Sequence, residues 1–414
     1  MTSADVRHAA VGAGTFAWDA AREVAHAAAT PLPPREVALA DADGAVLAAP
    51  LVAATDHPPV ARSAMDGYAV SGAPPWRVVD AGLQDGHLHA ISLREGGRAA
   101  MGHLAGGQAC AVVTGSSLPV GTTSVLADED AVRDGELLRG AAPPGRHIRP
   151  AAEECAAGDE VLPAGSRVTT AALGLAAALG HDRLLVHPLP RVTALVTGNE
   201  LVRSGRPGPG QVRDAIGPML PGLVTRAGAR LADPVAVPDG RDVMHTALAA
   251  AVGSADLVLV SGSSAAGPAD HLRPTLTELG AEILVDGVRC RPGHPQALAR
   301  IGDTLVVGLP GNPLAALAAF LTVAVPALAG LRGEPLPGLI AVPVPGGIAR
   351  HPVHTRLVPV VVEPYGAVPV GHAGSAMLRG AAAADAFAVV DPGPADAIAA
   401  RLLPLDPGAR PWAV

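Results

Sequence analysis

Acidic side chains follow three separate apolar runs in the second half of the chain. Glu200 follows one run of strand length, Asp239 stands at the end of a second, and Asp270 follows the small-residue turn after a third. Because the carboxyl ends of parallel strands meet at one edge of a sheet, the three carboxylates should lie along the same edge. Carboxylates beside a phosphate-binding loop are typical of a Mg²⁺ site. Helix capping would equally explain Asp239 and Asp270.

Turns of small residues join the same strand ends to the following helices. Ser261 and Gly262 open one such turn, which runs through Gly267 to the start of the next helical pattern. A loop of this kind leaves backbone N–H groups free beside the positive end of a helix dipole. The turn is therefore a candidate phosphate-binding loop.

Two proline-containing turns follow further along the chain. The turn 291–295 (RPGHP) presents two basic side chains, although an ordinary surface turn has the same residues. The turn 308–313 (GLPGNP) ends the last apolar run, with Asn312 at the expected helix cap and Pro313 at the first helical position. Its glycines are then free to approach a ligand closely.

The elements that must position these groups alternate between strand and helix. The apolar runs 191–198, 232–240, 255–262 and 303–311 are separated by helical patterns at 215–227, 241–252, 269–279 and 313–329. Buried strands that alternate with helices predict a doubly wound, parallel α/β sheet. Short runs broken by Gly and Pro precede this region, and further short runs follow it, so a β-rich domain is expected on each side.

The composition excludes several classes of protein. Among 414 residues, 49% are hydrophobic but only 2% are aromatic, and the formal net charge is −8. This balance argues against nucleic-acid binding, which needs basic surfaces and stacking side chains. The sequence contains no lysine, which excludes Schiff-base chemistry and a P-loop lysine.

Nothing in the sequence indicates export or a membrane. The three cysteines, Cys110, Cys155 and Cys290, are scattered, and the N-terminal residues have no signal-peptide pattern. The run 314–331 is nearly long enough to cross a bilayer, but it contains a threonine and a proline and lacks a basic flank on its N-terminal side. We therefore expect a buried helix in a cytoplasmic protein.

Five strings carry a family resemblance: SAMDGYAV (63–70), AGDEVLPAGSRVT (157–169), TGNEL (197–201), PGHP (292–295) and GLPGNP (308–313). In this order and spacing they resemble the molybdopterin molybdenumtransferase family, which includes bacterial MoeA and the E domain of gephyrin. The resemblance extends from about residue 16 to the end of the chain. It implies a homodimer that takes adenylylated molybdopterin and molybdate, inserts molybdenum at the dithiolene and releases AMP. A molybdopterin adenylyltransferase and other maturation proteins are the partners it suggests.

The resemblance also implies a four-domain subunit. Its parts are an N-terminal linker and dimerisation domain (1–50 and 148–187), a β-rich inserted domain (51–147), an α/β molybdopterin-binding domain (188–332) and a C-terminal β domain (333–414).

The family's functional positions fall on identifiable residues of this chain. Glu200, Asp214 and Asp270 match its acidic catalytic positions, and Asp239 and Asp270 match its Mg²⁺ ligands. The substrate-binding positions are Glu154, Ser261, Gly262, Gly267, Arg291, His294, Pro295, Gly308, Pro310, Gly311, Asn312, Arg356 and Ser375.

Several positions depart from the family pattern. Arg291 replaces a lysine and Glu154 an aspartate, so both keep their charge. The substitutions that lose a charge or a polar group are Ala61, Asn199, Ile216, Ala265, His294 and Ala315. The departures weaken the molybdate pocket more than the phosphate-binding turns.

Three functions therefore remain open. The chain is a working insertase with a retuned oxyanion pocket, a paralogue that binds the pterin or a nucleotide as a carrier or assembly partner, or an enzyme that uses another phosphorylated substrate.

Overall fold

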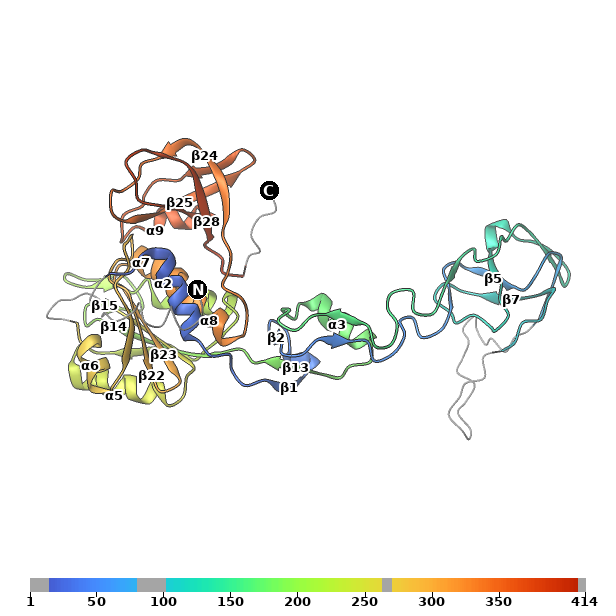
Figure 1. Ribbon diagram of the computed structural model, residues 1–414, viewed down its shortest axis with the longest axis horizontal. Helices are drawn as coiled ribbons and strands as arrows, with labels where there is room; N and C mark the ends of the chain where they lie inside the picture. The colour runs from blue at the N-terminus through green and yellow to red at the C-terminus, as the bar shows by residue number, and fades with distance from the viewer. Residues whose placement is uncertain (1–14, 80–101, 263–269, 409–414) are drawn as a thin grey trace, which may run out of the picture. The chain divides into compact units, whose positions relative to one another are not determined.

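The computed structural model describes residues 15–79, 102–262 and 270–408 (Figure 1). The chain divides into two compact units. One comprises Met1–Arg35, Gly44–Ala48 and Leu185–Val414, and the other comprises Glu36–Asp43 and Ala49–Leu184. Every predicted site residue except Glu154 belongs to the first unit.

A mixed sheet forms the centre of the first unit. Its strand order is β17-β14-β19-β23-β22-β20, and β18 also pairs with β14. The strands are β14 (Arg191–Thr197), β17 (Arg230–Leu231), β18 (Val235–Val237), β19 (Leu257–Ser261), β20 (Glu282–Asp286), β22 (Ala297–Ile301) and β23 (Thr304–Leu309). The ladders β14–β17, β14–β18, β14–β19 and β19–β23 are parallel, as the apolar runs predicted.

Three strands of this sheet, β17, β20 and β22, lie outside the predicted apolar runs. β22 pairs antiparallel with both β20 and β23, so the sheet is parallel on one side only. These strands are short, and their partners are decided by contacts that a local hydrophobic pattern does not report.

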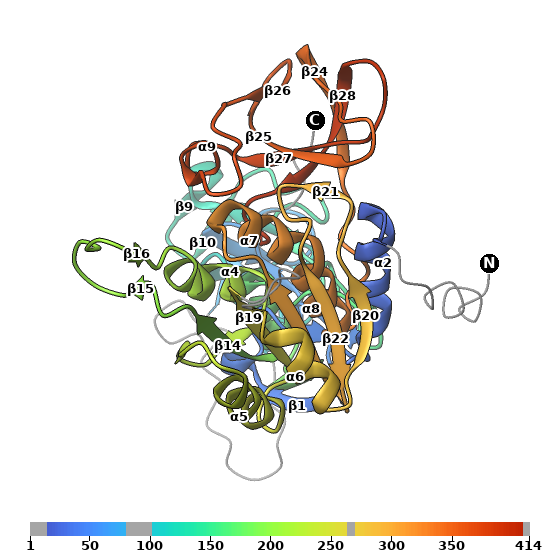
Figure 2. The same cartoon turned by 90° about the vertical axis from the view of Figure 1, so that its left-hand side faces the viewer.

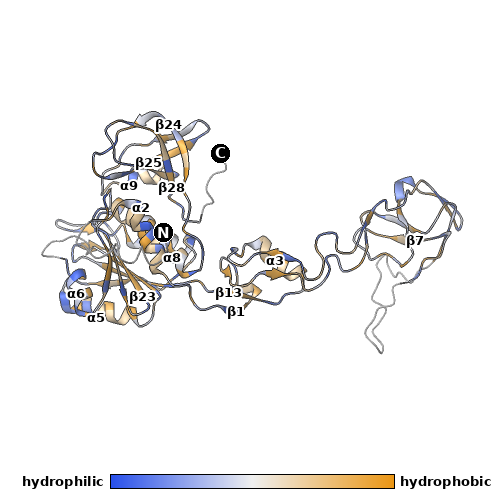
Figure 3. Ribbon diagram, viewed as in Figure 1, coloured by the Kyte–Doolittle hydropathy of each residue, from blue (hydrophilic) through white to orange (hydrophobic). Residues whose placement is uncertain are grey.

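Helices cover both faces of the sheet. Leu257 and Leu259 of β19 pack into the core with α2 (Trp18–Ala28), α4 (Leu220–Arg226) and the helix that follows β23, whereas Val258 and Val260 face α5 (Arg241–Val252) and α6 (Leu272–Glu278). The sheet lies between these two groups of helices in Figures 1 and 2. Hydrophilic residues of α5 and α6 are visible in Figure 3. The doubly wound α/β domain is confirmed.

The predicted buried helix is also confirmed. It consists of α7 (Pro313–Ala319), a π-helical turn, η4 (Phe320–Ala324), and α8 (Val325–Leu331). Pro326 has no N–H to continue the regular hydrogen-bond ladder of the helix, which is consistent with the wider turn before it. Among the described residues, this helix alone is long and apolar enough to cross a membrane, and 94% of its apolar window is buried. The Trp18 indole donates a buried hydrogen bond to the Thr322 hydroxyl at 3.0 Å.

A second sheet completes this unit, in the order β21-β25-β27-β28-β24, with β26 paired to β25. Its elements are β21 (Cys290–Arg291), β24 (Ile340–Ile348), β25 (Thr355–Glu363), β26 (Gly366–Pro369), α9 (Leu378–Ala382), β27 (Ala386–Val390) and β28 (Ala397–Pro404). The predicted C-terminal β domain is confirmed. Its edge strand β21, however, comes from the turn that follows β20.

The other unit is rich in short strands, as predicted. Its main sheet has the order β8-β5-β7-β6-β10-β9 and is built from β5 (Gly67–Val70), β6 (Trp76–Val78), β7 (Gln108–Val112), β8 (Ser124–Ala127), β9 (Val132–Asp134) and β10 (Leu137–Arg139). Smaller pairs join β3 (Leu51–Val52) to β12 (Glu160–Leu162) and β4 (Arg62–Ser63) to β11 (Ile148–Arg149). Helix α3 (Thr170–Ala178) is capped by the Thr169 hydroxyl, which accepts the N–H of Ala172.

Three further short strands lie near the points where the chain passes from one unit to the other. They are β1 (Arg35–Ala38), β2 (Val46–Leu47) and β13 (Arg183–His187), and β2 pairs antiparallel with the end of β13.

Candidate functional site

The carboxyl ends of β14, β19 and β23 meet, as their order in the sheet requires. The Thr197 hydroxyl donates to the Ser261 carbonyl at 2.6 Å, and the Gly262 N–H donates to the Leu309 carbonyl at 3.2 Å. Ser261 is the register partner of Leu309. The structure therefore brings the predicted residues Ser261, Gly262, Gly308, Pro310 and Gly311 together at one edge of the sheet.

Gly262 cannot be replaced at this edge without strain. Its φ is 88°, and a Cβ there would lie 2.6 Å from Thr197 Oγ1 and 2.7 Å from the Thr197 carbonyl oxygen. A Cβ on Gly311 would lie 3.6 Å from the Gly262 Cα, so the two turns run close together. This close approach exposes backbone rather than side chains at the strand ends.

Asn199 lies in the turn after β14, and two hydrogen bonds connect it to Asp239, which follows β18. The Asn199 N–H donates to Asp239 Oδ2 at 2.9 Å, and the Asp239 N–H donates to Asn199 Oδ1 at 3.1 Å. The cap of α5 is Gly240, so capping does not explain Asp239. Asn199, a departure from the family pattern, thus has a defined structural partner.

Asp270 has a different environment. Its side chain is only 4% exposed and pairs with Arg273 at 2.8 Å, and its Oδ1 accepts the N–H of Leu272, the first residue of α6. Arg273 also pairs with Asp286. Both oxygens of the Asp270 carboxylate therefore already accept hydrogen bonds, one of them from the beginning of α6.

The other two acidic candidates also differ in burial. Asp214 is buried, and its Oδ1 accepts the N–H groups of Ile216 and Gly217 at 3.0 and 2.9 Å, which fixes the turn before α4. Glu200 is exposed in the turn after β14. Glu200 is therefore the more accessible of the two.

A metal ion needs donors that the described residues supply only in part. Within residues 15–79, 102–262 and 270–408, no group of three His, Cys, Asp or Glu side chains is arranged to hold a metal. Mg²⁺ in nucleotide sites, however, takes only one or two carboxylates and completes its shell with phosphate oxygens and water. The exposed Asp239 fits this requirement, whereas Asp270 fits it only if the ion displaces Arg273.

A second cluster lies where β21 joins the C-terminal sheet. Arg291 and Arg356 are register partners in the parallel pairing of β21 with β25. They line a pocket of about 350 Å³ together with Pro292, His351, Leu357, Val358, Ala373 and Ser375. Three predicted residues, Arg291, Arg356 and Ser375, therefore share one pocket, which has basic side chains and no carboxylate in its lining.

The two clusters are connected through Asn312. Asn312 is the cap of α7, as predicted, but its side chain makes no capping bond and instead donates to Ser375 Oγ at 3.3 Å. The Ala315 N–H donates to the Ser375 carbonyl at 3.1 Å. The turn after β23 is thereby fixed against the wall of the basic pocket.

The turn 291–295 is held by buried groups beneath it. The Gln296 side chain, which is fully buried, donates to the Gly293 carbonyl at 2.7 Å and to Cys290 Sγ at 3.4 Å. Burial raises the pKa of the Cys290 thiol to about 12, so this thiol is a packing group. All three cysteines are buried, and none of them forms a disulfide.

His294 and Pro295 are not among the residues that line the basic pocket in the described chain. The ring of His294 is bonded at Nδ1 to the Val288 carbonyl at 2.8 Å. His351 lines the pocket instead. The sequence analysis missed His351, and its only local signal is the pair of histidines in HPVHTR (351–356).

Glu154 and Gly267 are the remaining site predictions. Glu154 belongs to the other unit, where it faces His57 at 3.5 Å. Gly267 and Ala265 lie outside the described residues.

Three of the departures from the family pattern are packing residues in this chain. Ile216 and Ala315 are 6% and 3% exposed, and Ala61 packs against the core of the β-rich unit. Apolar side chains at these positions therefore add to the hydrophobic cores.

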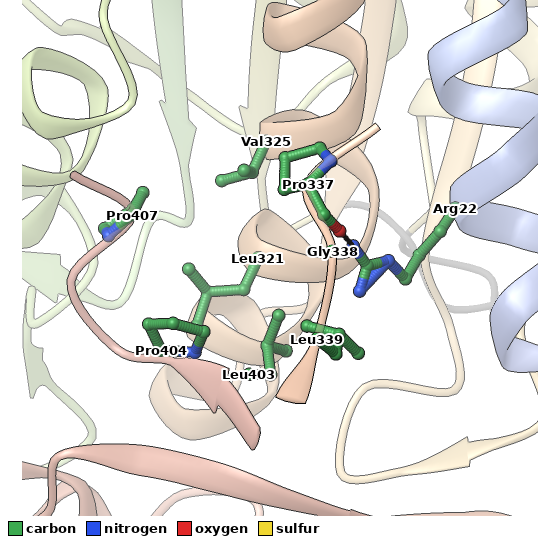
Figure 4. Close-up of a pocket in the computed structure, with 9 residues that line it drawn as sticks. All are labelled: Arg22, Leu321, Val325, Pro337, Gly338, Leu339, Leu403, Pro404 and Pro407. Atoms are coloured by element: carbon green, nitrogen blue, oxygen red, sulfur yellow. Dashed lines mark hydrogen bonds between the residues drawn. The ribbon is translucent and has the colours of Figure 1, made fainter. Parts of the chain in front are cut away.

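A further cavity, of about 130 Å³, contains none of the predicted residues. It is mostly apolar and lies beside the Arg22 side chain, whose Nη2 donates to the Pro337 carbonyl at 2.6 Å (Figure 4). Arg22 also lies over the Trp18 ring at 5.0 Å, and burial lowers its pKa to about 10. We assign Arg22 a structural role.

Comparison with known protein families matches nearly the whole chain. Residues 16–180 match the MoeA N-terminal region (domain I and II), residues 193–330 a probable molybdopterin binding domain, and residues 341–399 the MoeA C-terminal region (domain IV).

Two relatives are similar over most of their length. Molybdopterin molybdenumtransferase 2 of Mycobacterium tuberculosis is 36% identical over 317 residues, which cover 73% of this chain and 76% of the relative. Molybdopterin molybdenumtransferase of Haemophilus influenzae is 30% identical over 305 residues, 72% of each chain.

A solved structure shows the same fold. The molybdopterin biosynthesis MoeA protein of Pyrococcus horikoshii superposes with a TM-score of 0.73 at 24% identity, covering 95% of this chain and 99% of that one.

Proposed function

Because the chain belongs to the molybdopterin molybdenumtransferase family, we propose that it inserts molybdenum from molybdate into adenylylated molybdopterin and releases AMP. The observation that carries this proposal is the pairing of Arg291 with Arg356 in a pocket that Asn312 connects to the strand-end turns. The basic pocket suits a tetrahedral oxyanion, and the strand-end turns suit a phosphorylated pterin.

The basic pocket supplies the charge that molybdate needs. Arginine stays protonated throughout the working pH range and presents paired N–H donors to an oxyanion. Arg291 and Arg356 lie side by side on adjacent strands, and the Ser375 hydroxyl adds a neutral donor. The lysine that the family has at position 291 is thus replaced by a side chain suited to bidentate contact.

The strand-end turns supply the complementary site for the adenylylated pterin. Gly262 and the turn after β23 lie at the carboxyl edge of the sheet, where phosphate groups bind in doubly wound folds. We assign Ser261, Gly262, Gly308, Pro310 and Gly311 to this role. Glu200 is an exposed carboxylate in the turn after β14, and the buried Asp214 holds the turn before α4 in place.

Asp239 is our proposed Mg²⁺ ligand, with Asp270 as a second ligand once the ion has displaced Arg273. Mg²⁺ bound there would neutralise charge on the phosphate oxygens as AMP leaves. Asp239 is already oriented by its two hydrogen bonds with Asn199.

The homodimer in this proposal follows the family resemblance, and the cytoplasmic location follows the scatter of the three cysteines. We propose a cytoplasmic homodimer that receives its substrate from a molybdopterin adenylyltransferase. Sedimentation of the purified chain tests the dimer, and a monomer at micromolar concentration would contradict it.

The pocket is tested by the dependence of AMP release on molybdate. Arg291→Gln and Arg356→Gln should each raise the molybdate concentration for half-maximal release roughly tenfold or more, because each removes a charge-assisted contact. The matched control is Arg350→Gln, whose guanidinium donates to the Asp391 carbonyl and which does not line the pocket. Unchanged molybdate dependence in both pocket variants would place the oxyanion elsewhere.

A further inference from the structure

His351 is a histidine of the basic pocket to which the family resemblance assigns no role. It lines the pocket with Arg291, Arg356 and Ser375, and none of the lining residues is acidic. The hydrogen bonds around its ring define what it can offer an anion.

The Nδ1 atom of His351 is a hydrogen-bond acceptor. It accepts the backbone N–H of Val353 at 3.1 Å and that of His354 at 3.0 Å. A backbone N–H can only donate, so Nδ1 carries no proton, and the neutral ring must carry its proton on Nε2. His351 therefore has an N–H donor on the ring nitrogen that these two bonds leave unoccupied.

The ring of His354 packs against the same side of His351. Its Nδ1 lies 3.3 Å from Nδ1 of His351, and the two rings meet edge to face with centroids 4.6 Å apart. Since His351 Nδ1 accepts, His354 Nδ1 must be the donor of that contact. Burial, with the nearby Arg291, His351, His294 and Arg289, lowers the pKa of His354, so this second ring is neutral near pH 7.

We propose that His351 is a further oxyanion-binding residue, which donates its neutral Nε2–H to the anion held by Arg291 and Arg356, and that His354 is its positioning residue. The inference rests on the proposed function, because the anion is molybdate. It assigns to His351 a donor role in the pocket, while the ring of His294 is held by the Val288 carbonyl.

Two substitutions of His351 separate the role of its acceptor, Nδ1, from that of its donor, Nε2. His351→Asn places an amide oxygen where it can accept the N–H groups of Val353 and His354, as in an Asx turn, but it removes the Nε2 donor. His351→Gln keeps an N–H donor near the Nε2 position and gives up that local acceptor. The first variant therefore tests binding, and the second tests the turn.

Calorimetric titration of the pterin-free protein with molybdate measures the effect. The Asn variant should bind molybdate roughly tenfold more weakly or worse, with its thermal midpoint within about 2 °C of wild type. The Gln variant should keep more of the affinity and lose more stability. His245→Asn on α5, which does not line the pocket, is the matched control and should leave both quantities unchanged.

The outcomes distinguish this inference from the proposed function. Wild-type affinity in the Asn variant, while the wild type binds molybdate, would overturn the role of His351 and leave the proposed function standing. A wild type that binds no molybdate would overturn both. Nitrogen-15 spectra of the histidine rings give an independent readout: His351 should show the Nε2–H tautomer and shift on adding molybdate, and an Nδ1–H tautomer would contradict the proposal.

Discussion

Substitution of Asp270 by asparagine separates its structural role at the beginning of α6 from its proposed role as a Mg²⁺ ligand. The asparagine oxygen can still accept the N–H of Leu272, but the charge that faces Arg273 is lost. Breaking a fully buried ion pair costs about 3–5 kcal/mol and an exposed pair at most about 1 kcal/mol. Arg273 is 28% exposed and keeps Asp286, so we expect a loss of about 2 kcal/mol, or about 4–8 °C in the unfolding midpoint of a unit of this size.

The effect on activity tests the proposed role of Asp270 as a Mg²⁺ ligand. If Asp270 joins the Mg²⁺ shell by exchanging Arg273 for the ion, Asp270→Asn should also raise the Mg²⁺ concentration needed for AMP release by roughly tenfold or more. Arg273→Gln should lower that concentration, because it removes the competitor of the ion while leaving the carboxylate.

Asp286→Asn is the matched control. Its carboxylate is 57% exposed and contacts the same arginine, so the loss of stability should stay below about 1 kcal/mol and the Mg²⁺ dependence should not change. Our reasoning is refuted if Asp270→Asn loses the expected stability but keeps wild-type Mg²⁺ dependence. Asp270 would then serve only α6.

Two further predictions concern the turns. Gly262→Ala should lower the unfolding midpoint and abolish pterin binding, because its Cβ would lie 2.6 Å from Thr197 Oγ1 at a φ of 88°. The control is Gly253→Ala, which should be neutral or stabilise the protein by up to about 1 kcal/mol, because the φ of Gly253 is −69° and the nearest atom to its Cβ would be 3.8 Å away. Equal behaviour of the two variants would contradict the tight approach of the turns. Hydrogen bonds from the backbone N–H and then the hydroxyl of Thr114 lower the pKa of Asp66, so its stabilising contribution is present above the unfolded pKa of about 4 and is lost as the pH falls below it. Unfolding midpoints measured from pH 6 down to pH 3 should therefore fall more steeply in wild type than in Asp66→Asn, and parallel curves would remove Asp66 from that turn.

The strand-end cluster could be predicted because it depends on local patterns. Continuous apolar runs that end in glycine indicate buried parallel strands, and the carboxyl ends of such strands share one edge of the sheet. The meeting of Thr197, Ser261, Gly262 and Leu309 follows from that rule. The cap position of Asn312 and the buried helix after it were equally local signals.

The basic pocket depends on pairing that no local pattern reports. Arg291 meets Arg356 only because the two-residue strand β21 pairs with β25 across a long stretch of chain. A shift of one residue in that register would turn the arginine to the other face. Arg291 and Arg356 were therefore predicted only through the family resemblance, which assigns no role to His351.

Side-chain networks were the least predictable part of the site. Asp239 and Asp270 both lie near the ends of predicted strands. Asp239 nevertheless exchanges hydrogen bonds with Asn199, whereas Asp270 is buried against Arg273. The spacing of Asp270 and Arg273 allows a pair on one helical face. Whether such a pair forms depends on the burial of its surroundings, and the Asp270 side chain is only 4% exposed.

The release of AMP from adenylylated molybdopterin by the purified chain, with Mg²⁺ and with or without molybdate, tests the central proposal most directly. We expect release that depends on molybdate and yields a product containing molybdenum. Binding of the adenylylated pterin without release in either condition would contradict the insertase, and would identify the chain as a carrier or assembly partner.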